Sequence, residues 1–329
     1  MEYTQLGPRG PRVSTIGFGA WAIGGMNWGP TDDDESRKAL HAALDRGVTF
    51  IDTADVYGFG HSEELIAGVL MERGLAGRGG SGREYVIVAT KAGNDFYHAS
   101  EKDDRGYGPI RQNCDKNYLI FAAEQSLRRL GVQTLDLLQL HSPDLDWLEQ
   151  DEPWDALATL KRAGKIRHTG LSIQSFKETE QAHLLDQHHD LLDCIQVRYN
   201  LLERAAEDVL FSKAQHHGIG VIVRIPLLFG LLTGKFTRVS TFGEDDHRRA
   251  NLSPEKLDLY IRRLEALQPL FTRYPGQTVT QVALRFCLTH PACQTAIPGA
   301  KTEAQVADNS AASDYGPLTP EDLALVSTV

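Results

Sequence analysis

Polar side chains that could take part in acid–base chemistry end several short apolar runs in this sequence. Asp52 ends the run at residues 48–51 (VTFI), and Tyr57 follows in a turn beside a glycine. Four later runs end in or carry a further polar residue: Lys91, His141, Ser172 and Gln196. Each of them alone is typical of a turn former. Their recurrence at successive runs favours a shared site.

A tyrosine beside a lysine, a carboxylate and an imidazole suits one kind of proton transfer. Free tyrosine has a pKa of about 10 and is a poor acid or base at neutral pH. We expect Lys91 to stabilise the phenolate and lower the pKa of Tyr57, and Asp52 to keep the buried lysine charged. His141 would hydrogen-bond a substrate oxygen or share in the proton transfer. The group suits proton donation to a carbonyl oxygen as hydride reaches the carbon, without a nucleophile.

The elements that must hold these residues alternate regularly along the chain. Eight runs of strand length are each followed by a helical pattern, which indicates parallel strands covered by helices. We predict an α/β fold, a closed (β/α)8 TIM barrel that forms one domain over residues 1–329. A doubly wound open sheet is the alternative. A short hairpin with arms at residues 3–6 and 12–16 would precede the barrel, and an extra helix would begin at Thr319 and Pro320.

The expected elements have the following bounds. Strands are predicted at residues 16–19, 48–51, 85–90, 135–140, 166–172, 194–197, 219–224 and 294–297. Helices are predicted at residues 31–46, 62–73, 117–130, 153–163, 206–217, 280–290 and 303–312. A further helix after the fifth strand would open at a capping box from Ser175 to Glu178. The carboxyl ends of barrel strands share one mouth, where we expect the long loops 93–116 and 229–251.

The composition is that of an ordinary globular protein and disfavours some partners. The 329 residues carry a formal net charge of −10, which argues against nucleic acid or an anionic membrane as a partner. The four cysteines form no CxxC pair, so we expect them to be reduced, in a cytoplasmic protein. No apolar signal segment follows Met1, and no run approaches the length of a membrane helix.

Eight segments carry a resemblance to a known family. In chain order they are GFGAW from Gly17, IDTADVYG from Ile51, ATKAG around Lys91, LLQLHSPD around His141, GLSIQS from Gly170, IQVRYN from Ile195, PLLFGLLTGK from Pro226 and IPGAKTEAQVADN from Ile297. Over nearly its whole length the sequence resembles the aldo-keto reductase superfamily, bacterial NADP-dependent members in particular. The resemblance implies a barrel that reduces aldehydes or ketones reversibly with a nicotinamide cofactor. It also implies that Tyr57 donates the proton. Lys91 and Asp52 would tune Tyr57, and His141 would orient the carbonyl.

The cofactor, NADP(H), is implied by this resemblance and not by a phosphate-binding motif. The pattern GxGxxG fails after Gly17 and Gly19, and GLLTGK at residues 230–235 is too short for a P-loop, so a Rossmann domain is not supported. In the family an extended cofactor lies across the barrel mouth. Ser172 and Gln196 match positions that bind the nicotinamide carboxamide. The positions that match the nicotinamide and pyrophosphate strap are Arg224, Pro226, Leu227, Gly230, Leu231 and Lys235.

The last of these segments resembles the adenosine-phosphate site of the family. The matching residues are Gly299, Lys301, Gln305 and Asn309. A helix amino terminus favours anions, and Lys301 beside a 2′-phosphate favours NADPH over NADH. Thr302 to Gln305 is also a capping-box pattern, so Gln305 could cap the helix instead or as well.

Two positions depart from the common family pattern. Ile173 follows Ser172 where many relatives have asparagine, which puts one carboxamide contact in doubt. Arg224 stands where many have an aromatic ring that stacks on the nicotinamide, although a guanidinium plane can stack as well.

The remaining assignments concern the substrate and the competing functions. Trp21, Trp28 and Phe59 are candidates for the substrate pocket, with ordinary packing as the alternative for Trp28 and Phe59. No metal site is expected, because His216 and His217 fall at a helix end. The alternative function is a cofactor-binding redox sensor or regulatory subunit with little turnover, since some members of the superfamily are cofactor-sensing subunits of a channel complex. The identity of the small carbonyl substrate, the direction of the reaction and the oligomeric state stay open.

Overall fold

The strands of the central sheet follow the expected alternation. The computed structural model describes residues 1–26, 28–29, 31–75, 86–98 and 109–328. The strands of the sheet are β3 (Phe18–Gly19), β4 (Phe50–Asp52), β5 (Ile87–Ala92), β8 (Leu135–His141), β9 (Ile166–Ser172), β10 (Cys194–Arg198), β11 (Gly220–Arg224) and β12 (Cys293–Ala296). Neighbouring strands of this eight-stranded sheet are parallel. Parallel strands need crossover connections, which the helices supply.

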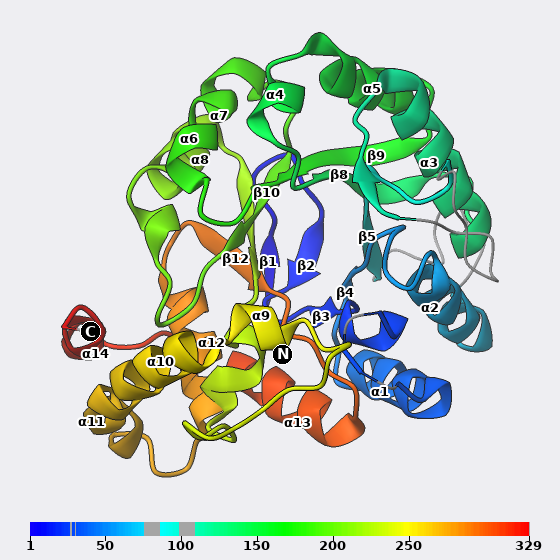
Figure 1. The fold of residues 1–329 in the computed structure, drawn as a ribbon. Helices are drawn as coiled ribbons and strands as arrows, with labels where there is room; N and C mark the ends of the chain where they lie inside the picture. Colours follow the sequence, from blue (N-terminus) through cyan, green and yellow to red (C-terminus); the bar gives the residue numbers. More distant parts are fainter. Residues whose placement is uncertain (27, 30, 76–85, 99–108, 329) are drawn as a thin grey trace.

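The sheet closes through contacts between its first and last strands. Isolated parallel bridges join Ile16 to Ala296 and Gly19 to Gly299. The Gly17 amide donates to the Ala296 carbonyl at 2.8 Å. Figure 1 looks along the resulting barrel, with the strands inside a ring of helices. The predicted (β/α)8 barrel is confirmed, and the open-sheet alternative is wrong.

Helices cover the outside of the barrel, apart from the short helix at Arg248–Asn251, which lies at the end of the barrel opposite the N-terminal hairpin. They are α1 (Asp33–Asp45), α2 (His61–Glu72), α3 (Lys116–Leu130), α4 (Leu145–Leu148), α5 (Asp151–Arg162), α6 (Glu178–Gln181), α7 (His183–His188), α8 (Leu210–His217), α9 (Arg248–Asn251), α10 (Pro254–Ala266), α11 (Gln268–Thr272), α12 (Val279–Thr289), α13 (Glu303–Ala311) and α14 (Pro320–Val326). Short 3-10 helices lie at η1 (Ala22–Gly24), η2 (Ala205–Glu207), η3 (Leu228–Thr233) and η4 (Ala312–Asp314). The strands are buried on both faces, since alternate residues pack inside the barrel and against these helices.

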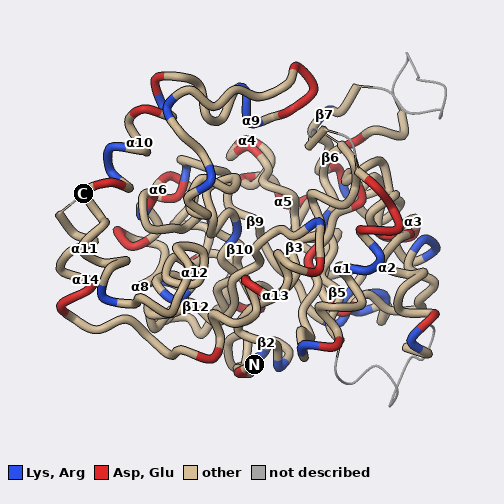
Figure 2. The backbone as a smooth tube through the Cα atoms, turned by 90° about the horizontal axis from the view of Figure 1, so that it is seen from below, with Lys and Arg blue, Asp and Glu red and all other residues tan. Residues whose placement is uncertain are grey.

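The N-terminal hairpin covers the amino-terminal end of the barrel. It pairs β1 (Tyr3–Gln5) with β2 (Arg12–Ser14), as predicted. Leu6 and Val13 are fully buried and belong to the cluster that fills the barrel interior. A Cβ at Gly7 would lie 2.6 Å from the Gly220 amide nitrogen, so only glycine allows this approach. Figure 2 shows β2 at one end of the molecule and α9, β6 (Asn94–Asp95) and β7 (Arg111–Gln112) at the opposite end.

Helix ends agree with the sequence at one predicted cap and differ at another. Thr319 and Asp322 form a capping box at the start of α14. The box expected from Ser175 to Glu178 is wrong. α6 begins only at Glu178, whose Oε1 accepts from the Phe176 amide at 3.1 Å, while Phe176 has a positive φ of 65°. Ser175 Oγ instead accepts from the Arg224 side chain at 2.9 Å, which ties this loop to the end of β11.

Both long connections contribute short elements beside the strand ends. In the loop 93–116, residues 99–108 lie outside the described residues, and β6 pairs with β7 as a small antiparallel ladder. The loop 229–251 contains most of η3 and all of α9, and Asp246 forms an antiparallel bridge with Trp28. No helix in the described part of the chain is long and apolar enough to cross a membrane.

The four cysteines are free and buried. They are Cys114, Cys194, Cys287 and Cys293. Burial raises the pKa of each thiol, that of Cys114 to about 12. The expected reduced state is consistent with this arrangement, because a protonated, buried thiol is unreactive.

Candidate active site

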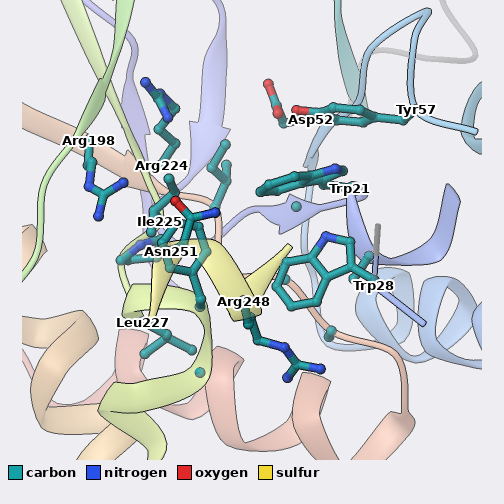
Figure 3. A pocket seen from close by; sticks show the side chains of 18 of the residues that line it. Trp21, Trp28, Asp52, Tyr57, Arg198, Arg224, Ile225, Leu227, Arg248 and Asn251 are labelled. Atoms are coloured by element: carbon teal, nitrogen blue, oxygen red, sulfur yellow. The ribbon is translucent and has the colours of Figure 1, made fainter. Parts of the chain in front are cut away.

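A cavity opens at the carboxyl ends of the barrel strands. Its volume is about 870 Å³, and both long loops contribute to its lining. The expected strand-end residues that line it are Asp52, Tyr57, His141, Ser172 and Gln196. Figure 3 shows Tyr57, Trp21 and Trp28 on one side of the cavity and Arg224 and Arg198 on the opposite side. The polar residues singled out from the sequence therefore share one site.

Lys91 lies buried between Asp52 and Tyr57. Its Nζ donates to Asp52 Oδ1 at 2.6 Å, to the Thr53 carbonyl at 2.8 Å and to the Tyr57 hydroxyl at 3.4 Å. The pairing of β4 with β5 sets Asp52 opposite Ala89, and Lys91 follows on the same face of β5. The strand register thus brings the ammonium to the carboxylate.

Two glutamines hold the second oxygen of Asp52. Gln196 Nε2 donates to Asp52 Oδ2 at 2.7 Å, and Gln139 Nε2 donates to the same oxygen at 3.2 Å. Both side chains are buried. Gln139 was not singled out from the sequence, although a glutamine inside the apolar run LLQL is a detectable signal. These amides fix the carboxylate so that Oδ1 faces Lys91.

The ionisation of Tyr57 and Lys91 differs in part from the expectation. Burial raises the pKa of Tyr57 by more than the charge of Lys91 lowers it, so the pKa lies above its ordinary value. The charge of Lys91 does lower the pKa of Tyr57, as expected, but by less than burial raises it. Burial lowers the pKa of Lys91, but Asp52 and Tyr57 raise it by more. At neutral pH the pair is therefore an ammonium beside a protonated phenol.

His141 is a neutral imidazole next to Tyr57. The two ring centroids are 5.7 Å apart, nearly perpendicular. Burial, then the charges of Lys91 and Arg224, hold the pKa of His141 well below its usual range. Its Nδ1 is buried and has no hydrogen-bond partner in the described part of the chain. A neutral imidazole can donate through one nitrogen only, so the nitrogen facing the cavity can donate to a substrate oxygen when it carries the proton.

Arg224 ends β11 on the opposite side of the cavity. Its Nη2 donates to the Ile173 carbonyl at 2.8 Å and to Ser175 Oγ at 2.9 Å. Burial, then the charge of Arg198, lowers the pKa of Arg224 to about 10. Ser172 Oγ lies 3.0 Å from Ser142 Oγ. Both positions that depart from the family pattern, Ile173 and Arg224, are thus joined by one hydrogen bond.

The other end of the cavity is positively charged. Lys235, Arg248 and Lys301 line it, and Arg248 forms an ion pair with Asp246. Burial, then Arg248, lowers the pKa of Lys301, and Lys235 acts in the same direction. Lys301 Nζ donates to the Trp28 carbonyl at 3.0 Å. Such a cluster of cations favours an anionic ligand.

The start of α13 completes this basic end. Thr302 Oγ1 accepts from the Gln305 amide at 3.3 Å, but Gln305 Oε1 accepts from the Lys301 amide at 2.7 Å rather than from Thr302. Only half of the capping box is therefore formed. Asn309 Nδ2 donates to the Gly299 carbonyl at 3.3 Å. The other expected cofactor residues that line the cavity are Pro226, Leu227, Gly230, Gly299, Gln305 and Asn309, whereas Leu231 is buried outside the lining.

Aromatic rings form the wall beside Tyr57. Trp21 stacks on Tyr57 with centroids 6.1 Å apart and meets Trp28 edge to face at 5.3 Å. His247 stacks on Trp21 at 4.5 Å, a contact that no sequence pattern indicated. Phe59 lies outside the cavity lining and packs on Phe96 at 5.4 Å, as in the alternative of ordinary packing.

A second group of acidic side chains lies behind the cavity. Asp55 is fully buried, and neither carboxyl oxygen has a hydrogen-bond partner among the described residues. Burial, then the charge of Glu63, raises the pKa of Asp55 well above its usual range. Glu63 accepts from Thr90 Oγ1 and from Arg129 Nε, both at 2.6 Å. Burial therefore favours the protonated form of Asp55, while Glu63 is ion-paired with Arg129.

The arrangement can protonate an oxygen anion that forms in the cavity. Tyr57 holds a proton, Lys91 can stabilise the phenolate that remains, and His141 lies beside both. Within the described residues, no group of three or more His, Cys, Asp or Glu side chains is arranged to hold a metal ion.

Comparisons with known proteins extend over nearly the whole chain. The sequence profile described as Aldo/keto reductase family matches residues 15–329. Aldo-keto reductase YhdN of Bacillus subtilis (strain 168) is 34% identical over 332 residues, with 100% of this chain and 93% of the relative covered. A probable voltage-gated potassium channel subunit beta of Arabidopsis thaliana is 29% identical, with 97% of this chain and 93% of the relative covered. The solved structure of glycerol dehydrogenase AKR11B4 from Gluconobacter oxydans has a TM-score of 0.79 and 33% identity, over 98% of this chain and 93% of the other.

Proposed function

Because this chain belongs to the aldo/keto reductase family, we propose that it reduces aldehydes or ketones to alcohols with NADPH, reversibly, with Tyr57 as the proton donor. Family membership supports carbonyl reduction by an oxidoreductase. The observation that carries the finer proposal is the position of Lys91 Nζ, which contacts both Asp52 and the Tyr57 hydroxyl at the cavity.

The residues of the cavity fit a nicotinamide dinucleotide. Lys235, Arg248 and Lys301 suit its phosphates, and Lys301 next to the α13 amino terminus supports a 2′-phosphate. Ser172, Gln196 and Arg224 lie at the Tyr57 end, where the nicotinamide would bind. When bound, this group supplies the hydride.

The chain's own residues would then carry the proton and orient the carbonyl. The substrate oxygen would lie within hydrogen-bond distance of the Tyr57 hydroxyl and of His141. As hydride reaches the carbonyl carbon, the proton of Tyr57 passes to the oxygen. Lys91 stabilises the resulting phenolate, and Asp52 keeps Lys91 charged. Trp21 and Trp28, with the described residues of the loops 93–116 and 229–251 that line the cavity, would select the substrate by contact with its remaining atoms.

The first test combines turnover with binding. Wild-type protein is mixed with NADPH and a reactive aromatic aldehyde, and oxidation of NADPH is followed by absorbance. Tyr57→Phe should abolish reduction but bind NADPH with unchanged affinity, because the phenol is replaced without loss of the ring. Activity retained in Tyr57→Phe would contradict the assignment of Tyr57 as the proton donor.

A second candidate function is a cofactor-binding sensor with little turnover. It is supported by the similarity to a protein named as a potassium channel subunit. The same assay separates the two: tight binding of NADPH without reduction of any compound in a panel of carbonyls would favour the sensor. The complete set of Asp52, Tyr57, Lys91 and His141 supports the enzyme.

A further inference from the structure

Arg224 is a cation that faces the cavity without an acidic partner. Among the described residues, no ion pair joins it to a carboxylate, and both acceptors of its Nη2 are neutral oxygens. Its Nε is buried and has no hydrogen-bond partner within the residues that the structure describes. By contrast, Lys91 is paired with Asp52, and the Arg198 guanidinium is bonded through two nitrogens to Glu203. The charge of Arg224 is therefore less compensated than the charges beside it.

The nearby carboxylates are engaged elsewhere. Asp52 bonds to Lys91 and to the two glutamines, and Glu178 accepts from the Phe176 amide at 3.1 Å. Both act on Arg224 only at a distance. The field of Arg224 reaches the reacting groups, since it contributes to keeping His141 neutral. The Tyr57 end of the cavity therefore has a net positive potential.

We propose that Arg224 makes the site bind the reduced, neutral nicotinamide ring more tightly than the oxidised, cationic ring. The inference rests on the proposed function, because transfer of hydride to a carbonyl at Tyr57 requires the ring to lie beside that residue, within reach of Arg224. The phosphates are identical in the two forms of the cofactor, so their contacts with Lys235, Arg248 and Lys301 cancel in the ratio of affinities. What differs is one positive charge on the ring, close to an unpaired guanidinium.

This preference for the reduced ring affects the release of the cofactor after carbonyl reduction. Reduction of the substrate removes a hydride, with its electron pair, from the neutral ring and leaves a cation next to Arg224, while the proton of Tyr57 goes to the substrate oxygen. Repulsion between the two cations favours departure of the oxidised cofactor. Arg224 thus acts as a determinant of cofactor redox state, in addition to any stacking of its guanidinium plane.

The test is equilibrium binding, which needs no turnover. Dissociation constants for NADPH and NADP+ are measured by calorimetry for wild type, Arg224→Gln and Arg224→Lys, and the NADH/NAD+ pair is measured in the same way. We expect the NADP+/NADPH ratio of dissociation constants to fall by about tenfold in Arg224→Gln, on the scale of one screened charge–charge interaction. Arg224→Lys keeps the charge without the plane and should keep the ratio. Lys301→Met is the matched control, because it should weaken both forms equally.

The possible outcomes are separable from failure of the proposed function. If wild type binds neither form of either cofactor, the proposed function is wrong. If both forms bind and the ratio is the same in Arg224→Gln as in wild type, the inference is overturned. If Arg224→Gln does not fold, the affinities of wild type for NADPH and for NADP+ are each compared with its affinity for 2′-phospho-ADP-ribose, which lacks the nicotinamide ring. The neutral ring must then add more affinity than the cationic ring, and equal gains would refute the role of charge.

Discussion

Lys91 Nζ and Asp52 Oδ1 lie 2.6 Å apart, and their side chains are only 1% and 3% exposed. Such a buried pair costs desolvation of both charges, and removal of one partner leaves the other uncompensated. Both partners are therefore needed for the stability of the barrel as well as for the support of Tyr57. Substitutions at either position are expected to affect folding and chemistry together.

Asp52→Asn should lower the free energy of unfolding by about 3–5 kcal/mol, because Lys91 would stay buried without its counter-charge. Urea denaturation at neutral pH measures the loss. The double variant Asp52→Asn/Lys91→Met removes both charges and should be less destabilised than the sum of the single variants. Strictly additive losses would show that the two charges do not depend on each other.

The reduction rate should be independent of pH through neutrality. The pKa of Tyr57 is raised above its ordinary value, so the proton is present throughout this range and is lost only as pH rises through that elevated pKa. Alcohol oxidation needs the phenolate and should instead accelerate as pH rises. Values of kcat in both directions, measured against pH at saturating cofactor, test this. A decline in reduction between about pH 6 and 8 would point to a titrating histidine instead.

Asp55→Asn should stabilise the protein at neutral pH. The folded-state pKa of Asp55 is raised, so the unfolded state ionises first, and the free energy of unfolding falls as pH rises from about 4 towards the folded-state pKa. An amide of the same shape cannot ionise and avoids this cost, so Asp55→Asn should be more stable than wild type at neutral pH. Urea denaturation at pH 5 and pH 8 provides the measurement, with a larger gain at the higher pH.

Asp190 offers a matched control for this substitution, because its side chain is 95% exposed. Asp190→Asn should leave stability within about 0.5 kcal/mol of wild type at both pH values. If Asp55→Asn is less stable than wild type, the carboxyl of Asp55 has a structural role that an amide cannot fill.

Lys301→Met should reduce the preference for NADPH over NADH by about tenfold, because a charge-assisted contact with the 2′-phosphate is lost. The affinities of the two cofactors, measured by calorimetry, give the ratio directly. Lys38→Met, which removes an exposed cation of α1, should leave the ratio unchanged. An unaltered ratio in Lys301→Met would indicate that Arg248 or Lys235, and not Lys301, binds the 2′-phosphate.

The positions of the strand-end residues could be predicted because each follows an apolar run that can only be a buried strand. Asp52, His141 and Ser172 end β4, β8 and β9 as expected, and closure of the sheet brings these strand ends to one mouth. The predicted capping box at Ser175 is wrong because a local pattern competes with tertiary contacts. The serine hydroxyl accepts a hydrogen bond from Arg224 instead of capping the helix. Sequence patterns describe what a residue prefers nearby, not what approaches it from another strand.

Other features depend on burial, which a sequence pattern does not measure. The raised pKa of Tyr57 follows from desolvation that outweighs Lys91. Asp55 looks like an ordinary polar turn residue in the sequence, yet it is fully buried. His247 reaches Trp21 only because the loop 229–251 folds over the mouth, a path that has no periodic signal.

The four buried thiols make the molecule convenient for spectroscopy. Because all of the cysteines are buried and their pKa values are raised, maleimide reagents should leave the native protein unlabelled. A single new thiol at Val239, which is 86% exposed in the loop 229–251, would then carry a fluorophore or spin label alone. The same loop includes Asp246 and Arg248, so a probe at residue 239 would test whether the loop changes position when a cofactor binds, without removal of any native residue that lines the cavity.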